Sequence, residues 1–167
     1  MAVVDKYVNS YLEADKKGPA YTTVGANLVA MVATEEIAAA DDDTSVYRFF
    51  KNVPANLIPL EITVMSDGVT GGNDYDLGLY TPNDGAVIDK DILMDGQDVS
   101  SALTRASGHQ LGLANVDIAY AELSLGELDV AVNTSNTALP AYDIALTANT
   151  VGTAAGTITI SALFIVK

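Results

Sequence analysis

The chain has 167 residues, no cysteine, and 22 acidic against 8 basic residues, which gives a formal net charge of −14. The length fits one folded domain, and the absence of cysteine excludes disulfides and thiolate metal sites. Because so acidic a surface repels phosphate backbones, we do not expect nucleic-acid binding.

The first 20 residues differ from the rest in pattern and in charge. Apolar residues recur there at helical spacing, and Gly18-Pro19 is a typical signal for the end of a helix. A helix of about a dozen residues is marginal by itself, so the segment needs a partner surface, and an extended arm is the alternative. It lacks the basic and apolar regions of a secretory signal. We predict that residues 1–20 form an N-terminal arm or short helix whose partner-binding residues are Val4, Tyr7, Val8, Tyr11, Leu12, Lys16 and Lys17.

Residues 21–167 carry the pattern of a β-sandwich domain. The apolar run 24–34 predicts a strand, and Asp41-Asp42-Asp43 predicts a charged turn after it. Residues 46–53 are aromatic and β-branched, which favours a second strand ending at Pro54. Residues 60–64 alternate, which predicts a third strand with Leu60, Ile62 and Val64 on its buried face.

A glycine-rich connector and two further strands follow. Residues 66–73 contain three glycines and short polar residues, as turns do. Residues 75–79 alternate again, with Tyr75, Leu77 and Leu79 on the buried face. Asn83-Asp84-Gly85 predicts a tight turn before a short strand at 86–88.

The middle of the chain gives weaker signals. Asp98 is suited to cap a short helix over residues 99–105. We expect a strand over 110–115, one helical turn over 120–125 that ends at Gly126, and mostly loop over 130–139.

The longest uncharged run covers residues 144–166. It is long enough for a membrane span, but it is rich in threonine and it alternates, so we predict a hairpin of two strands and no membrane contact. An exposed edge without charge would promote aggregation, so the second strand should pair on both sides. Its predicted core residues include Ile158, Ile160 and Phe164. Many short strands with regular turns indicate an all-β fold, an antiparallel β-sandwich that is jelly-roll-like.

No catalytic or cofactor-binding residue stands out. The single histidine, His109, has a loop-like context and no nucleophile signature near it, so we predict no enzyme activity. Acidic turns suggest possible calcium ligands, but the closing glutamate of a calcium loop is missing, and acidic turns are usually solvated. We therefore predict no metal and no cofactor. The acidic turns in question are Asp89 and Asp91 with Asp95, Asp41 to Asp43, and Asp67 with Asn73, Asp74 and Asp76.

A resemblance to a known group of proteins covers roughly residues 44–167. It rests on VYRFFKNVPAN at 46–56, IPLEITVMSD at 58–67, DYDLGLYTPNDGAVIDKDIL at 74–93, IAYAELSLGEL at 118–128 and the strands after residue 141. These segments resemble the capsid decoration, or cement, proteins of tailed bacteriophages.

The resemblance implies a non-enzymatic virion protein on the outer surface of the capsid, made in the host cytoplasm. It implies binding to the major capsid protein and to further copies of this chain, with a trimer favoured over a dimer. The alternative is a receptor- or carbohydrate-binding module of a tail fibre or spike, for which aromatic-rich loops would be typical.

Overall fold

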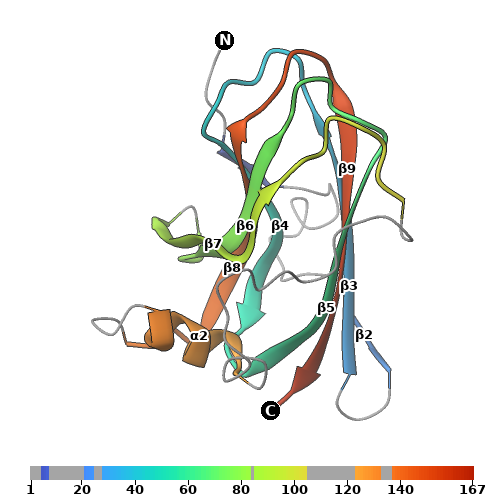
Figure 1. Cartoon of the computed structure of the whole chain (residues 1–167). Helices are drawn as coiled ribbons and strands as arrows, with labels where there is room; N and C mark the ends of the chain where they lie inside the picture. The colour runs from blue at the N-terminus through green and yellow to red at the C-terminus, as the bar shows by residue number, and fades with distance from the viewer. Residues whose placement is uncertain (1–4, 8–20, 25–27, 84, 105–122, 133–136) are drawn as a thin grey trace.

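Two β-sheets face each other in the computed structural model, shown in Figure 1. The structure describes residues 5–7, 21–24, 28–83, 85–104, 123–132 and 137–167. A five-stranded sheet has the order β1-β4-β8-β6-β7, and a four-stranded sheet has the order β2-β3-β9-β5. The elements are β1 (Asp5–Tyr7), β2 (Tyr21–Val24), β3 (Leu28–Ile37), β4 (Ser45–Pro54), β5 (Leu57–Ser66), β6 (Asp74–Tyr80), β7 (Val87–Gln97), α2 (Leu125–Val132), β8 (Ala141–Thr150) and β9 (Gly156–Val166).

The connections are those of a jelly roll. From β3 to β6 each successive strand joins the opposite sheet, and β8 and β9 again lie in different sheets. β8 pairs with β4 and β6, whereas β9 pairs with β3 and β5. This interleaving of two Greek keys confirms the predicted all-β, jelly-roll-like sandwich.

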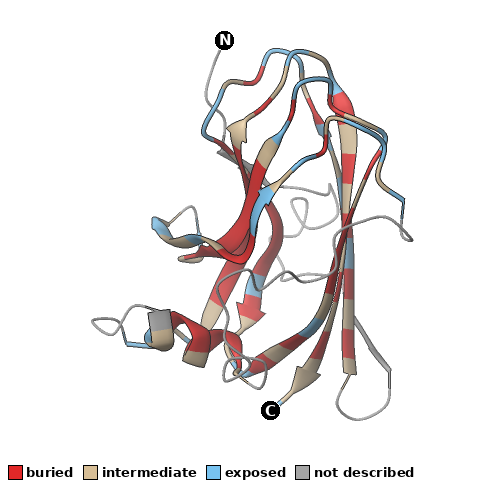
Figure 2. Ribbon diagram, in the orientation of Figure 1, coloured by how far each residue is buried: buried red, intermediate tan, exposed pale blue. Residues whose placement is uncertain are grey.

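The core fills the space between the two sheets (Figure 2). Period-2 alternation places every second residue of β9 inside, and Ile158, Ile160 and Phe164 are fully buried there. Because β9 pairs on both sides, the prediction for this strand is confirmed. The facing residues of β8 are Tyr142, Ile144, Leu146 and Ala148.

The predicted C-terminal hairpin is wrong, because β8 and β9 do not pair with each other. The link at 151–155 carries the chain from one sheet to the other instead. A strand predicted over 24–34 is also divided, since Val24 ends β2 and Leu28 begins β3. Local alternation identified these strands but not their partners.

The register of β5 shifts at its centre. Pro59 lies opposite Phe164 and Glu61 lies opposite Leu163, so a β-bulge places one extra residue between them. That residue, Leu60, is 46% exposed, and its predicted burial beside Ile62 is wrong. An unbroken alternation from Leu60 cannot hold across a bulge.

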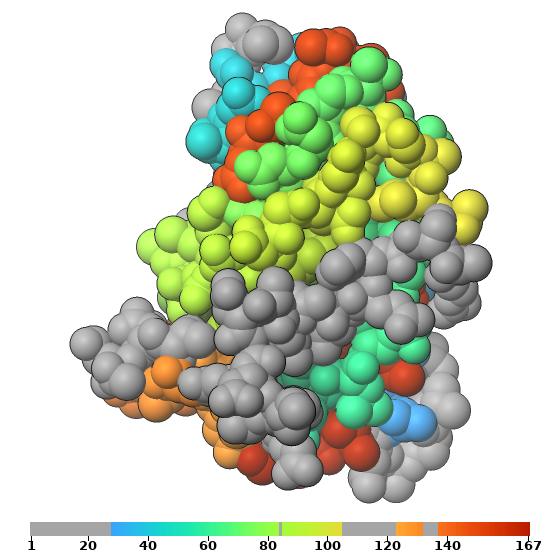
Figure 3. Space-filling model, viewed as in Figure 1, coloured from blue at the N-terminus to red at the C-terminus, as the bar shows by residue number. Residues whose placement is uncertain are grey.

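The strand β6 is covered on both faces, although its alternation predicted one buried face. On β6, Leu77 pairs with Met94 of β7, but Leu79, two residues later, pairs with Asp89. The extra residues of β7 between these two pairs lie over the outer face of β6. A Cβ added at Gly78 would lie 2.1 Å from the Asp89 carbonyl oxygen. Only glycine therefore permits this close approach. Figure 3 shows β7 and the segment after it as a continuous band across the molecule.

The helix predictions need correction. Asp98 does accept a hydrogen bond from the Ser100 backbone N–H, at 2.8 Å, but residues 99–104 form no helix. A helix forms later, where Glu127 Oε2 accepts hydrogen bonds from the Ser124 backbone N–H at 2.9 Å and the Ser124 hydroxyl at 2.8 Å, which is one half of a capping box. Gly126 therefore lies in the first turn of α2 and does not end a helix. Residues 105–122, including His109 and the strand expected at 110–115, lie outside the described residues.

At the N-terminus, β1 lies parallel to β4, with Tyr7 opposite Arg48. These three residues form a strand, which is compatible with the extended-arm alternative and not with a helix at this point, and residues 8–20 lie outside the described residues. In the described part of the chain, no helix is long and apolar enough to cross a membrane.

Burial of β9 leads to a test of the core. Replacing Ile160 with alanine should lower the free energy of unfolding by about 2–5 kcal/mol, because transfer energy is lost and a cavity remains. Leu60→Ala on the bulge is the matched control and should cost less than about 1 kcal/mol. Urea unfolding followed by circular dichroism measures both. Equal losses for the two variants would contradict the assignment of faces.

Candidate interaction surfaces

A buried polar layer lies on the outer face of the five-stranded sheet. Arg48 and Asp143 are 1% and 0% exposed, and Arg48 Nη1 lies 3.4 Å from Asp143 Oδ2. The guanidinium also donates to the Gly85 carbonyl at 3.0 Å and lies 5.0 Å from the centre of the Tyr80 ring. Burial raises the pKa of Asp143 above its ordinary value, against the opposing effect of Arg48 and the Asn52 N–H. This pair is enclosed by protein and not presented to a ligand.

The same layer continues around Asp76. Its carboxylate accepts hydrogen bonds from Lys90 Nζ at 2.7 Å, Asn149 Nδ2 at 2.6 Å and the Gly96 N–H at 2.9 Å. Burial alone would raise the pKa of Asp76, but these hydrogen bonds outweigh it and hold the pKa below its ordinary value. The carboxylate therefore stabilises the sheet in its charged form.

The acidic turns considered as calcium ligands bind donors of the protein itself. Asp41 accepts from the Tyr47 hydroxyl, Asp43 from the Val151 N–H and Asp67 from the Thr157 N–H. Among the described residues, no three His, Cys, Asp or Glu side chains are arranged to hold a metal ion. Every buried side-chain polar atom in this part of the chain has a hydrogen-bond partner. These carboxylates join loops to strands.

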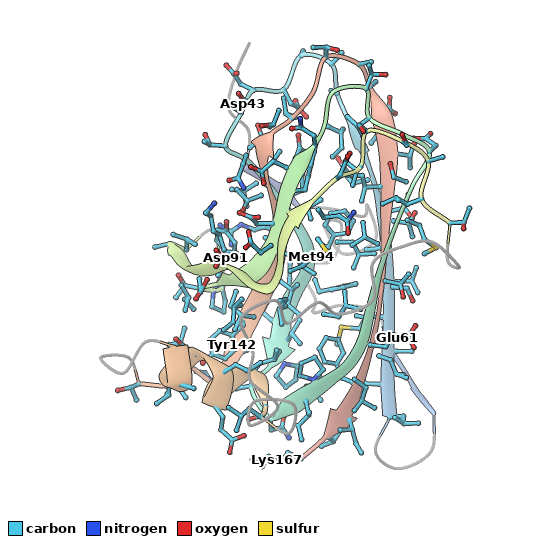
Figure 4. The ribbon with its side chains drawn as sticks, viewed as in Figure 1. Asp43, Glu61, Asp91, Met94, Tyr142 and Lys167 are labelled. Carbon is cyan, nitrogen blue, oxygen red and sulfur yellow. The ribbon has the colours of Figure 1, made fainter. Side chains whose placement is uncertain are left out.

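An acid pair lies where β7 passes over the sheet. Asp89 Oδ1 accepts the Asp91 backbone N–H at 3.3 Å. Figure 4 shows Asp91 on the side of this sheet that faces away from the four-stranded sheet. Burial, and next a hydrogen bond shared with the Asp91 carboxyl, raise the pKa of Asp89 to about 6, and the charge of Asp129 adds to this. Asp89 is thus a proton-binding group near neutral pH.

An open apolar groove of about 540 Å³ lies between α2 and the turn from β4 to β5. Its walls include Ala55, Leu123 and Val130, and Val130 is 38% exposed. The Lys167 ammonium group binds the Glu127 carboxylate, which also lines the groove. Glu127 is the one ionisable side chain among the described residues that line the groove.

The outer face of the four-stranded sheet is mostly half-buried, with a few exposed residues, and it carries few charges. We call it the outer four-strand face and define it by Leu28, Ala30, Val32, Thr34 and Glu36 of β3, Thr157, Thr159, Ser161, Leu163 and Ile165 of β9, and Ile58, Leu60, Glu61, Thr63 and Met65 of β5. Val32 is 54% and Leu60 46% exposed. Its ionisable residues are Glu36, which is exposed, and Glu61, which Figure 4 labels on β5.

The predicted partner-binding residues lie mostly outside the described part of the chain. Only Tyr7 falls within it, on β1, so Val4, Val8, Tyr11, Leu12, Lys16 and Lys17 stay predictions. Sequence reasoning missed the outer four-strand face. Its signal was present in the other half of the β9 alternation, where Leu163 and Ile165 occupy outward positions that are usually polar.

The pKa of Asp89 predicts a pH dependence. Because the folded state binds this proton more tightly than the unfolded chain, the stabilisation is complete below about pH 4 and is lost as the pH rises through about 6. The melting temperature of the parent should therefore fall relative to Asp89→Asn over this range. Asp95→Asn, exposed on the same strand, is the matched control and should follow the parent. Melting curves of parent and Asp89→Asn that stay parallel from pH 4 to pH 7 would contradict the assignment.

No protein family and no curated protein matches this sequence. In three dimensions the chain is similar to a solved chain described as "Cyanophage Pam1 capsid asymmetric unit", with a TM-score of 0.53 and 14% sequence identity. The superposition covers 95% of this chain and 97% of that chain. At this identity the similarity establishes a shared fold. Since nearly all of both chains is covered, the shared fold is that of the whole chain and not of a single motif.

Proposed function

We propose that this chain is a non-enzymatic decoration, or cement, protein of a phage head. It binds the outer capsid surface and stabilises the shell by bridging subunits of the major capsid protein. The observation that carries this proposal is the near-complete structural match to a chain of a phage capsid asymmetric unit. Because that chain is of nearly the same length, the match supports the role of a small virion component.

The surfaces of the molecule are consistent with binding and not with catalysis. The carboxylates of Asp41, Asp67 and Asp76 accept hydrogen bonds from donors of the protein itself, which supports a structural role for them. The outer four-strand face and the groove at α2 offer apolar area to a partner. A single copy needs an interface of about 1,600 Å² in total, and a homo-oligomer multiplies such attachments by avidity. We favour a trimer at three-fold positions over a dimer at two-fold positions.

Intact particles provide the direct test. In cryo-electron microscopy of the phage that carries this chain, density for the sandwich should lie on the outside of the head. Heads stripped of the protein should release DNA at a lower temperature than complete heads, because the bridging contacts are gone, and adding back purified protein should restore the release temperature. Density confined to the tail tip would favour the fibre or spike module instead.

The N-terminal segment is proposed to dock on the capsid or on a neighbouring copy. Since β1 pairs with β4, deleting the whole segment would also remove a strand, so point variants are the better test. Tyr11→Ser with Leu12→Ser removes apolar area and should weaken head binding at least tenfold, about 1.4 kcal/mol, with little change in melting temperature. Thr22→Ser on β2 is a conservative control. A double variant that melts far lower yet binds heads fully would contradict the proposal.

A further inference from the structure

The outer four-strand face consists of cross-strand rows with two charged residues, Glu61 in the second row and Glu36, opposite Thr157, in the last. The first row joins Leu28, Ile165 and Ile58, and the next joins Ala30, Leu163 and Glu61. Two more rows follow, Val32 with Ser161 and Thr63, and Thr34 with Thr159 and Met65. A solvent-facing sheet surface normally alternates with the core in polarity, so these apolar rows indicate a surface that a partner covers.

Hydroxyl groups of Thr34, Thr159 and Thr63 on this face are already paired. The hydroxyl groups of Thr34 and Thr159 are 2.8 Å apart across β3 and β9. The Thr63 hydroxyl donates to the Glu61 carboxylate at 3.1 Å. A partner can therefore cover these residues without leaving their hydroxyl groups unsatisfied, which lowers the cost of burial.

Charge indicates which partner. Each copy carries a net charge of −14, so most of its surface repels another copy, and like charges facing each other across an interface are costly. The outer four-strand face brings two carboxylates per copy to a contact, Glu36 in its last row and Glu61 on β5, out of the 22 acidic residues of the chain. It is thus a surface on which two copies of this chain can meet without burying rows of like charge.

The area is sufficient for weak self-association. Three strands of about ten residues cover roughly 33 Å by 15 Å, or about 500 Å² per copy. Two copies would bury about 1,000 Å², which is at the lower limit of a specific interface. We therefore propose that the outer four-strand face is the surface through which this chain associates with a second copy of itself. The proposal rests on the self-association within the proposed function, and not on capsid binding.

Two valines allow a matched test. Val32 on this face and Val87 on β7 of the other sheet are each 54% exposed. Replacing either with glutamate adds the same charge at the same exposure. Sedimentation equilibrium from about 1 to about 100 µM should show a parent mass above 17.4 kDa, and Val32→Glu should raise the dissociation constant at least tenfold. Val87→Glu should leave the constant unchanged.

A second measurement does not depend on how the glutamate variants fold. The chain has no cysteine, so Val32→Cys and Val87→Cys each introduce a single thiol. Maleimide labelling at Val32→Cys should slow as the protein concentration rises, whereas labelling at Val87→Cys should not. A parent that stays at 17.4 kDa, equal effects of the two glutamates, or labelling independent of concentration would each overturn the proposal.

Binding to heads separates this inference from the proposed function. If Val32→Glu keeps the parent's mass but no longer binds heads, the face contacts the capsid protein, and the self-association proposal is wrong. If Val32→Glu dissociates while even the parent fails to bind heads, the decoration role is wrong and the self-association surface stands.

Discussion

Both sheets depend on a central strand that comes late in the sequence. β8 joins β4 to β6, and β9 joins β3 to β5, so residues 28–80 form complete sheets only after residues 141–166 insert between them. The short link between β8 and β9 packs closely on the connector at 66–73, where the Thr153 N–H donates to the Thr70 carbonyl at 2.8 Å. Pairing between such distant segments loses loop-closure entropy before the contacts that stabilise the sheets can form. We therefore expect the last two strands to complete the fold.

The two outer faces of the sandwich have opposite characters. On the five-stranded sheet, β7 and the polar layer around Arg48 and Asp143 cover the outer face, and the buried polar groups bond to one another. On the four-stranded sheet, β9 and its neighbours leave apolar side chains in solvent. A polar layer that is fully bonded has no capacity left for a ligand, whereas an apolar face lowers its free energy when a partner covers it. This difference is why we propose the outer four-strand face as a contact surface.

Local signals in the sequence determined the strands and most of the turns. Alternation of period 2 identified the inward residues of β8 and β9, and glycine at 68 and 71 supplied the positive φ of 101° and 79° that the connector adopts. The all-β class followed from the number and spacing of these segments. The start of α2 was not predicted from Ser124 and Glu127, and the helix was expected one turn earlier.

Tertiary structure alone decided how the strands pair and which outer faces of the two sheets are covered. Alternation states which residues share a face, but it does not state what lies against the opposite face. The burial of Asp76 and Gly78 depends on β7 crossing over them, and the exposure of Leu60 depends on a bulge set by its pairing with β9. The division of β8 and β9 between two sheets likewise depends on partners about 65 to 135 residues away in the sequence. The strands themselves are local in origin, whereas the open face that a partner can use is a product of long-range packing.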